Sequence, residues 1–246
     1  MIAMDTCVRR ASLRLRTAAL AALAGVALAG TLGACTGDSS SAGSEKSPTA
    51  VLASARKALD RTSGVDLSLS TDNLPSGVTG VEKAQGVATH APAFDGSITV
   101  VLSGQPFDVP VVSTGGTVYV KLPLTPGWQD IDPGDYGAPD PAQLLSPDRG
   151  FSSLLAATTG VRKGDSVRGG TDNKEVLTEY SGSVSGTEVK HILPGASGDF
   201  DATYTVTSDG QLRSAKLTGV FYPGSDPMTY TVTFDDYGTD KQITAP

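Results

Sequence analysis

Cysteine and histidine are scarce in this sequence of 246 residues, which contains two of each. Cys7 and Cys35 lie near the N-terminus, and only Cys35 remains once the basic N-terminal segment described below is set aside. A single cysteine cannot form an intramolecular disulfide, and one cysteine with two distant histidines is not a zinc-binding pattern. We therefore expect neither a metal site nor a bound cofactor.

Catalytic motifs are also missing. The G-x-S-x-G motif of serine hydrolases is approached by GSVSG at residues 182–186, which has valine at the nucleophile position. His90 falls in a predicted strand and His191 in a short predicted helix, and neither has a nucleophile or carboxylate partner at motif spacing. We therefore expect no catalytic residue and predict that the protein is not an enzyme.

Loops that bind calcium or phosphate have no counterpart here. The acidic segment 130–140, DIDPGDYGAPD, lacks the glycine and the closing glutamate of a calcium-binding loop. The glycine pairs near residues 115 and 169 are not followed by a helix that starts with Lys-Ser or Lys-Thr. These stretches are therefore interpreted as turns.

The sequence has no apolar run long enough to make a typical membrane-spanning helix. Its longest candidate, residues 18–34, has 17 residues, against roughly 20 for a spanning helix. Arg9, Arg10, Arg14 and Arg16 precede this run, and no basic cluster follows it. This order predicts an export signal rather than a transmembrane anchor.

The end of the apolar run carries a second signal. Residues 32–35, Leu-Gly-Ala-Cys, resemble the lipobox of bacterial lipoproteins, in which the cysteine receives a lipid and becomes the first residue of the mature chain. We therefore predict a signal peptide over residues 1–34 and a lipid anchor at Cys35, which would hold the protein on the outer face of the cytoplasmic membrane. An ordinary signal peptide that happens to contain a cysteine is the alternative.

The segment after Cys35 is small, polar and flexible in composition. Residues 35–47 include no large apolar side chain and are predicted to form a tether. Removal of residues 1–34 leaves 15 basic and 25 acidic side chains, a net charge of −10. Such an acidic body disfavours nucleic acid as a partner and disfavours membrane binding through a basic patch.

The remaining chain, residues 48–246, is predicted to fold as one α+β domain. Hydrophobic periodicity and turn residues predict short strands in antiparallel meanders, with three helices between them. The Ser185–Glu188 stretch has the order of a capping box at the start of the third helix. The expected helices cover residues 48–61, 151–158 and 185–193, and the expected strands 65–69, 82–89, 97–103, 107–112, 117–122, 161–168, 175–181, 200–207, 211–220, 228–234 and 242–244.

Three consecutive predicted strands share an apolar face. Alternation places Ile98, Val100 and Leu102 on one side of their strand, and the next two strands show the same pattern. Such a face must be covered by helices or by a ligand. From periodicity alone, a core covered by helices is favoured over a ligand cavity.

Several segments resemble one known family. DPAQLLSPDRGFSSLLA at residues 140–156 is similar to the signature segment of the LprG/LppX family of mycobacterial and actinobacterial lipoproteins. Trp128, PAFDGSITVVLSG at 92–104 and the ending YTVTFDDYGTDKQITAP fit the same pattern. The order of lipobox, tether, helix and meander fits as well.

The resemblance implies a strongly bent antiparallel sheet, or half-barrel, with helices on its concave face enclosing an apolar cavity. It implies a carrier of acylated lipids, such as triacylated glycolipids or triacylglycerol, that works in cell-envelope assembly and in some members beside a membrane exporter. The alternative is an anchored scaffold or adaptor with a solid core. The expected cavity lining is Ile98, Val100, Leu102, Val109, Val118 and Val120 of the sheet and Leu154 and Leu155 of the covering helix.

Overall fold

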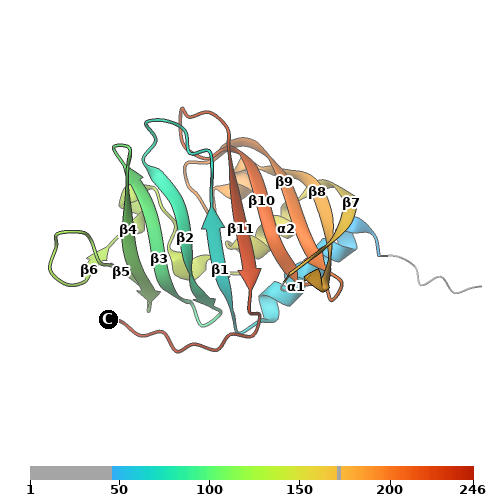
Figure 1. Ribbon diagram of the computed structural model, residues 1–246, viewed down its shortest axis with the longest axis horizontal. Coiled ribbons are helices and arrows are strands. Elements are labelled where there is room, and N and C mark those ends of the chain that lie inside the picture. The colour runs from blue at the N-terminus through green and yellow to red at the C-terminus, as the bar shows by residue number, and fades with distance from the viewer. Residues whose placement is uncertain (1–45, 171–172) are drawn as a thin grey trace, which may run out of the picture. The chain divides into compact units, whose positions relative to one another are not determined.

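Eleven antiparallel strands form one sheet in residues 46–170 and 173–246, which are the residues that the computed structural model describes (Figure 1). The predicted signal peptide, Cys35 and the tether as far as residue 45 lie outside these residues. The strands are β1(Gly64–Ser70), β2(Gly80–Thr89), β3(Ala93–Leu102), β4(Gln105–Thr114), β5(Thr117–Val120), β6(Gln129–Ile131), β7(Thr159–Gly169), β8(Glu175–Ser185), β9(Ser197–Thr207), β10(Leu212–Val220) and β11(Met228–Asp235).

The sheet consists of two meanders that join in its middle. Its strand order is β6-β5-β4-β3-β2-β1-β11-β10-β9-β8-β7, so every neighbour is also a neighbour in sequence except β1 and β11. Leu67 of β1 lies opposite Phe234 of β11, and both side chains are buried. The first and last strands of the domain therefore connect its two halves.

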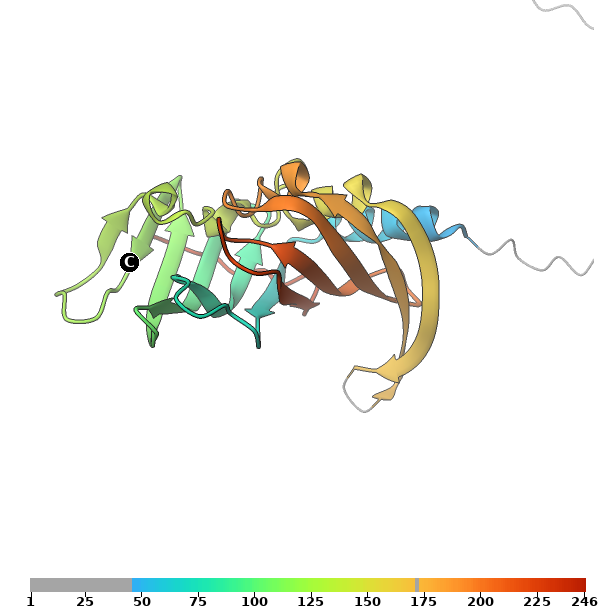
Figure 2. The same cartoon turned by 90° about the horizontal axis from the view of Figure 1, so that it is seen from above.

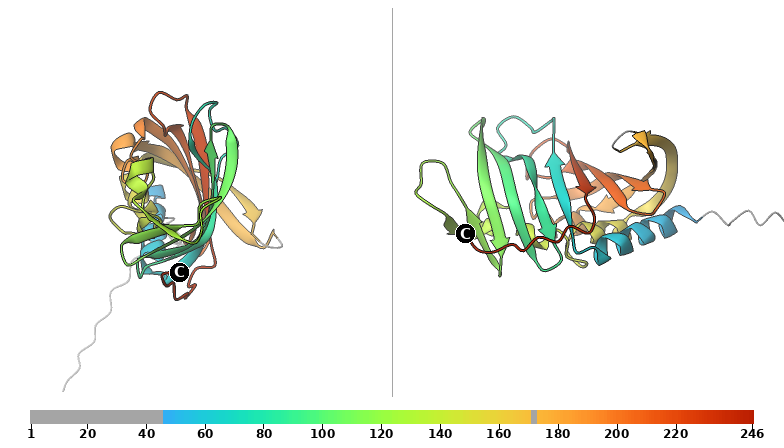
Figure 3. Two further views of the ribbon diagram at one scale, coloured as in Figure 1. Left: turned by 90° about the vertical axis from the view of Figure 1, so that its left-hand side faces the viewer. Right: turned by 60° about the horizontal axis from the view of Figure 1, so that its bottom comes forward.

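The sheet is strongly bent, and its two outer strands, β6 and β7, do not pair with each other. Figure 3 shows the sheet curving around the helices, and Figure 2 shows the long β7–β8 hairpin curving away at one end. Register shifts interrupt the β2–β3, β7–β8 and β9–β10 pairings, and such irregularities increase local twist and bending. The predicted half-barrel of an α+β fold is confirmed.

Short helices cover the concave face, as predicted (Figures 2 and 3). The covering elements are α1(Pro48–Arg61), the 3₁₀ helices η1(Pro133–Tyr136) and η2(Pro141–Gln143), α2(Phe151–Ala157) and α3(Gly186–Val189). The Ser47 side chain accepts a hydrogen bond from the Ala50 N–H at 3.3 Å, which caps α1, and Pro48 occupies its first turn. Leu52 and Leu59 form part of the buried face of α1, which packs against α2 and β10.

Three local predictions were wrong or incomplete. β6 was not predicted, because three residues are too few for alternation to be recognised. Residues 242–244 form no strand. Ser185 occupies the N-cap of α3, but its side chain makes no capping hydrogen bond, and the regular helix ends at Val189 rather than Leu193.

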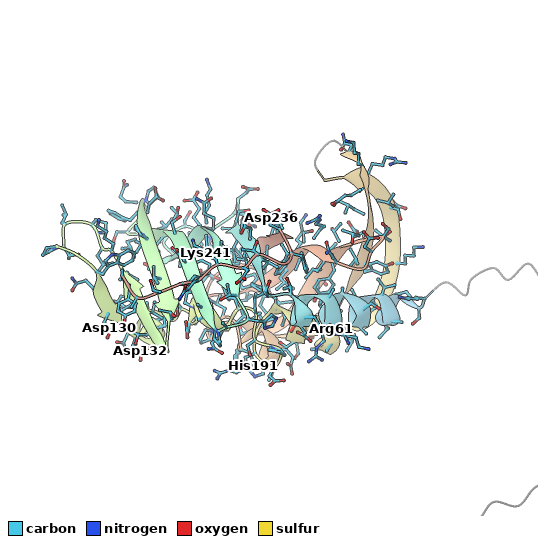
Figure 4. The ribbon with its side chains drawn as sticks, turned by 90° about the horizontal axis from the view of Figure 1, so that it is seen from below. Arg61, Asp130, Asp132, His191, Asp236 and Lys241 are labelled. Atoms are coloured by element: carbon cyan, nitrogen blue, oxygen red, sulfur yellow. The ribbon has the colours of Figure 1, made fainter. Side chains whose placement is uncertain are left out.

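The C-terminal segment after β11 crosses the outer, convex face of the sheet. Figure 4 shows Asp236 and Lys241 along this segment. The Gly238 N–H donates to the Gly64 carbonyl at 3.0 Å, and the Lys241 Nζ lies 2.8 Å from Oδ2 of Asp95 in β3. The segment is therefore fixed to the face opposite the helices.

Candidate functional site

The concave face of β3, β4 and β5 carries the apolar side chains that the sequence predicted to share a face. The strand register places Ile98 opposite Val109, and Val111 opposite Val120. Directly opposed residues of antiparallel strands point to the same side of a sheet. The structure thus brings the three alternating patterns together into one surface.

A cavity of about 120 Å³ lies between this concave face and the covering segments. Strands from both halves of the sheet line it: Leu67, Leu69, Val81, Ala84, Phe94, Ile98, Leu217, Tyr230 and Val232. The covering side is lined by Ala138, Pro139, Pro141, Leu144, Phe151, Val189, Ile192 and Leu193, and the segment after β10 adds Phe221 and Tyr222. Only the two tyrosine side chains in this lining contain a polar atom.

Two facing glycines lie against Phe94, whose side chain lines the cavity. Gly86 of β2 lies opposite Gly96 of β3. A Cβ atom on Gly86 would lie 2.7 Å from Cζ of Phe94, and one on Gly96 would lie 2.8 Å from the same atom. The end of the Phe94 ring therefore lies against both glycines, in space that a side chain on either of them would need.

The predicted lining residues fall into two groups. Ile98 lines the cavity, whereas Val109, Val118 and Val120 are buried on the same face without bordering it. The 3₁₀ helix η2 packs onto β2, β3 and β4 on this side of the cavity.

Val100 and Leu102 lie farther along the face of Ile98, near the β3–β4 turn. Val100 is half-buried, Leu102 is 45% exposed, and neither borders the cavity. The shared apolar face therefore extends beyond the cavity at this end.

The covering helix α2 contributes a different residue from those predicted. Phe151, at its start, lines the cavity, while Leu154 and Leu155 are buried in the core without bordering the cavity. The helix packs against α1, α3 and β8. A helix of seven residues has apolar side chains on more than one side, so periodicity did not distinguish these positions.

Most of the remaining lining was not predicted. Leu67 and Leu69 belonged to a recognised alternating strand, which was not assigned to the cavity because its place beside β11 was unknown. Ala138 and Pro139 lie in an irregular segment and Pro141 starts the three-residue helix η2, so no periodic signal exists for them. Tyr222 and Tyr230 come from the far end of the sequence, and only the β1–β11 pairing brings them to the first half of the sheet.

The two tyrosine hydroxyls lie together at one end of the cavity. Their oxygens are 2.8 Å apart. The Val81 N–H donates to the Tyr222 hydroxyl at 3.1 Å, and the Tyr230 hydroxyl donates to the Val81 carbonyl. Burial and the neighbouring Tyr222 raise the pKa of Tyr230, so its hydroxyl remains a proton donor at neutral pH.

The other candidate groups from the sequence are dispersed. His90 Nε2 lies 2.9 Å from the Leu59 carbonyl, and His191 is exposed, 3.8 Å from Glu188. Figure 4 shows His191 well separated from Asp130 and Asp132. Within residues 46–170 and 173–246, no three His, Cys, Asp or Glu side chains are grouped so that they could hold a metal ion.

Asp140 has a structural role in the acidic segment. Its carboxylate accepts hydrogen bonds from the Ser113 hydroxyl at 2.5 Å and from the Ala142 N–H at 2.9 Å, and so fixes η2 over β4.

Among the described helices, none is long and apolar enough to cross a membrane.

Comparison with known proteins identifies relatives over most of the chain. The LppX_LprAFG lipoprotein family model matches residues 47–245. The lipoarabinomannan carrier protein LprG of Mycobacterium tuberculosis, and that of Mycobacterium bovis, is 30% identical over 171 residues. The match covers 65% of this chain and 65% of LprG, so slightly less than two thirds of the relative is spanned.

Two crystal structures share the fold. LprF from Mycobacterium bovis superposes with a TM-score of 0.65 at 17% identity, covering 81% of this chain and 96% of LprF. LppX from Mycobacterium tuberculosis gives a TM-score of 0.59 at 19% identity, covering 80% of this chain and 98% of LppX. At these identities the two structures support the bent sheet and its covering layer, and nothing more specific.

Proposed function

This chain belongs to the LppX_LprAFG lipoprotein family, and we propose that it binds acylated lipids in the cavity and transfers or presents them during cell-envelope assembly. The observation that carries this proposal is a cavity whose lining is entirely apolar except for two tyrosines, in a homologue of a lipoarabinomannan carrier. Triacylated glycolipids and triacylglycerol are the proposed ligand classes.

The chemistry of the lining suits acyl chains. Moving one methylene from water into an apolar environment is favourable by about 0.8 kcal/mol, so several methylenes bind without any polar contact. Carriage also needs no nucleophile, acid or base at the ligand. The separate positions of His90 and His191 fit a carrier better than an enzyme.

The size of the cavity requires that the cover move on binding. Ligand pockets typically measure about 300–1,000 Å³, whereas this one measures about 120 Å³. Acyl chains therefore need additional space. The covering segments that carry Pro139, Leu144 and Ile192 lie outside the paired strands of the sheet, and we propose that they move outward.

We also propose the chain organisation that the sequence predicts. Residues 1–34 are a signal peptide, Cys35 carries the lipid anchor, residues up to 47 are a tether, and residues 48–246 form the lipid-binding domain on the outer face of the cytoplasmic membrane. Anchoring keeps the carrier near its source of lipid. A membrane exporter is the proposed protein partner, and nucleic acid is not a partner.

The test combines native mass spectrometry with lipid uptake. The purified protein should copurify with lipid and should take up triacylglycerol from phosphatidylcholine vesicles. Ile98→Trp should place a ring in the cavity and reduce uptake strongly while shifting the melting temperature little, because the added atoms enter space that lipid would occupy. Thr99→Trp, next to Ile98 in β3 but on the opposite face of the sheet, is the matched control and should leave uptake unchanged.

The small cavity also favours a second candidate, a scaffold with a solid core. In that case no lipid copurifies, and Ile98→Trp overfills a packed interior, which costs about 1–3 kcal/mol. If the wild-type protein takes up no lipid and Ile98→Trp melts several degrees below wild type, the results support the scaffold and contradict the carrier.

A further inference from the structure

Strand pairing is interrupted at one end of the cavity, where β1 is shorter than its neighbours. The last residue of β1, Ser70, pairs with Lys83 on one side and Thr231 on the other. β2 starts at Gly80 and β11 at Met228, so both strands extend past the end of β1 (Figure 1). We call this interruption the slot: the stretch where Gly80 and Val81 face residues 228–230 without a strand between them.

The backbone groups of Val81 at the slot are paired with tyrosine hydroxyls instead of a strand. Val81 donates through its N–H to Tyr222 and accepts through its carbonyl from Tyr230. Each hydroxyl has one proton, and that of Tyr230 is used on Val81, so Tyr222 donates the 2.8 Å bond to Tyr230. Three hydrogen bonds thus form a closed ring across the slot.

The surrounding packing is fitted to this ring. A Cβ atom on Gly80 would lie 2.6 Å from both Cζ and Oη of Tyr222, so only glycine permits this approach. The Tyr230 ring packs edge-to-face on Phe221 at a centroid distance of 4.8 Å. On the other side of the slot, the Asn73 side chain accepts from the Thr229 N–H at 3.0 Å.

The slot lies between the cavity and the surface. Val81, Tyr222 and Tyr230 line the cavity. The next two residues, Glu82 and Lys83, line a surface groove of about 440 Å³ that runs along the loop 71–78. Tyr230 is buried and Tyr222 is half-buried, and both border the cavity beside the strand that leads into this groove.

We propose that the slot is the mouth of the cavity and that the polar end of a bound acylated lipid lies in it. This proposal rests on the proposed lipid-binding function. An ester carbonyl can accept from a tyrosine hydroxyl or from the Val81 N–H, and a lipid hydroxyl can donate to the Val81 carbonyl. The ring then opens without leaving a backbone group unpaired.

Other positions in the lining cannot hold the polar end equally well. An ester or hydroxyl buried without a hydrogen bond loses its interactions with water and gains none in return. All other lining side chains are hydrocarbon. The tyrosines are thus positioning residues for the ligand, and the strength of their ring sets the rate of lipid exchange.

The test measures the rate at which a fluorescent triacylglycerol moves between phosphatidylcholine vesicles and the purified protein. Tyr222→Phe and Tyr230→Phe each remove a hydroxyl and keep the ring. Gly80→Ala keeps both tyrosines but displaces the Tyr222 hydroxyl. Tyr237→Phe is the matched control, because the Tyr237 hydroxyl donates to the Leu212 carbonyl at 2.8 Å and does not line the cavity.

We expect exchange about fivefold faster in the three slot variants, the factor for one net hydrogen bond, and a wild-type rate for Tyr237→Phe. If the wild-type protein binds the probe and all three slot variants exchange it at the wild-type rate, the slot is not the mouth of the cavity. The proposal that the protein carries lipid would still stand. A wild-type protein that takes up no probe overturns both proposals. If a phenylalanine variant does not fold, Gly80→Ala decides, with Gly164→Ala, whose Cβ has ordinary contacts, as its control.

Discussion

At the scale of single residues, two glycines leave room for Phe94, an aromatic residue that lines the cavity. Gly86 and Gly96 face each other on the concave surface, and the Phe94 ring occupies the space that their missing side chains leave. Neither glycine has the positive φ angle that only glycine adopts readily. Close approach, rather than backbone conformation, is therefore the reason for glycine at these positions.

Gly96→Ala is predicted to destabilise the protein. The new Cβ atom would meet the Gln85 carbonyl and would lie 2.7 Å from Cα of Gly86. Overpacking of this kind costs about 1–3 kcal/mol, and each kcal/mol lowers the melting temperature of a domain this size by about 2–4 °C. Thermal unfolding measures the effect. An unchanged melting temperature would show that the strands separate freely at this point.

Cys35→Ala is predicted to abolish anchoring. Cys35 is the only cysteine after the predicted signal peptide, and no other residue there offers a thiol for lipid attachment. The variant should accumulate as an unprocessed precursor or leave the membrane fraction. Fractionation and intact mass measure this outcome, and Cys7→Ala is the control that should behave as wild type. Normal processing and membrane retention of Cys35→Ala contradict the anchor.

At the scale of elements, the sequence predicted what depends on local periodicity and missed what depends on pairing. The alternation of Val65, Leu67 and Leu69 indicated β1, and Ser47-Pro48 marked the start of α1. No local pattern shows that β1 stops short of its neighbours or that Tyr230 reaches across to Val81. The slot is a consequence of long-range register, so sequence reasoning could not find it.

Ion pairing on the outer face links strands of the second meander. Arg213 of β10 donates from Nε and Nη2 to the carboxylate of Glu175 in β8, at 2.9 and 2.5 Å. Its Nη1 lies 3.2 Å from Oδ1 of Asp235 in β11. The bidentate geometry fixes the guanidinium between two strands. Hydrogen bonding by Arg213 lowers the pKa of Glu175.

This arrangement predicts an acid-sensitive contribution to stability. Since the pKa of Glu175 is lower in the folded protein, its contribution is present above the ordinary value of 4.5 and is lost as the pH falls through the folded value. Glu175→Gln should therefore melt below wild type at pH 7, and the difference should shrink below pH 4.5. Glu179→Gln is the control. A difference that does not change with pH contradicts this role.

At the scale of the whole domain, the fold consists of a continuously paired sheet and a cover that is attached to the sheet at separate points. The sheet is continuous from β6 to β7, with backbone hydrogen bonds along every pair of neighbours. The cover consists of short helices and irregular segments, and contacts such as Ser113–Asp140 hold it to the sheet at separate points. The family resemblance of the sequence predicted both the sheet and its cover. The volume of the cavity between them depends on how side chains from distant segments pack, which a sequence pattern does not show.

The last prediction follows from the mismatch between the cavity and its proposed ligand. If about 120 Å³ must enlarge to hold acyl chains, the cover must open while the sheet stays paired. Hydrogen exchange without lipid should therefore be faster in residues 138–150 and 190–196 than in β9 and β10, and lipid loading should protect the covering segments selectively. Asp140→Asn weakens the contact of η2 with Ser113 and should speed exchange there further. Equal protection of sheet and cover, unchanged by lipid, would mean that the interior is a rigid core, and lipid carriage by this cavity would then be excluded.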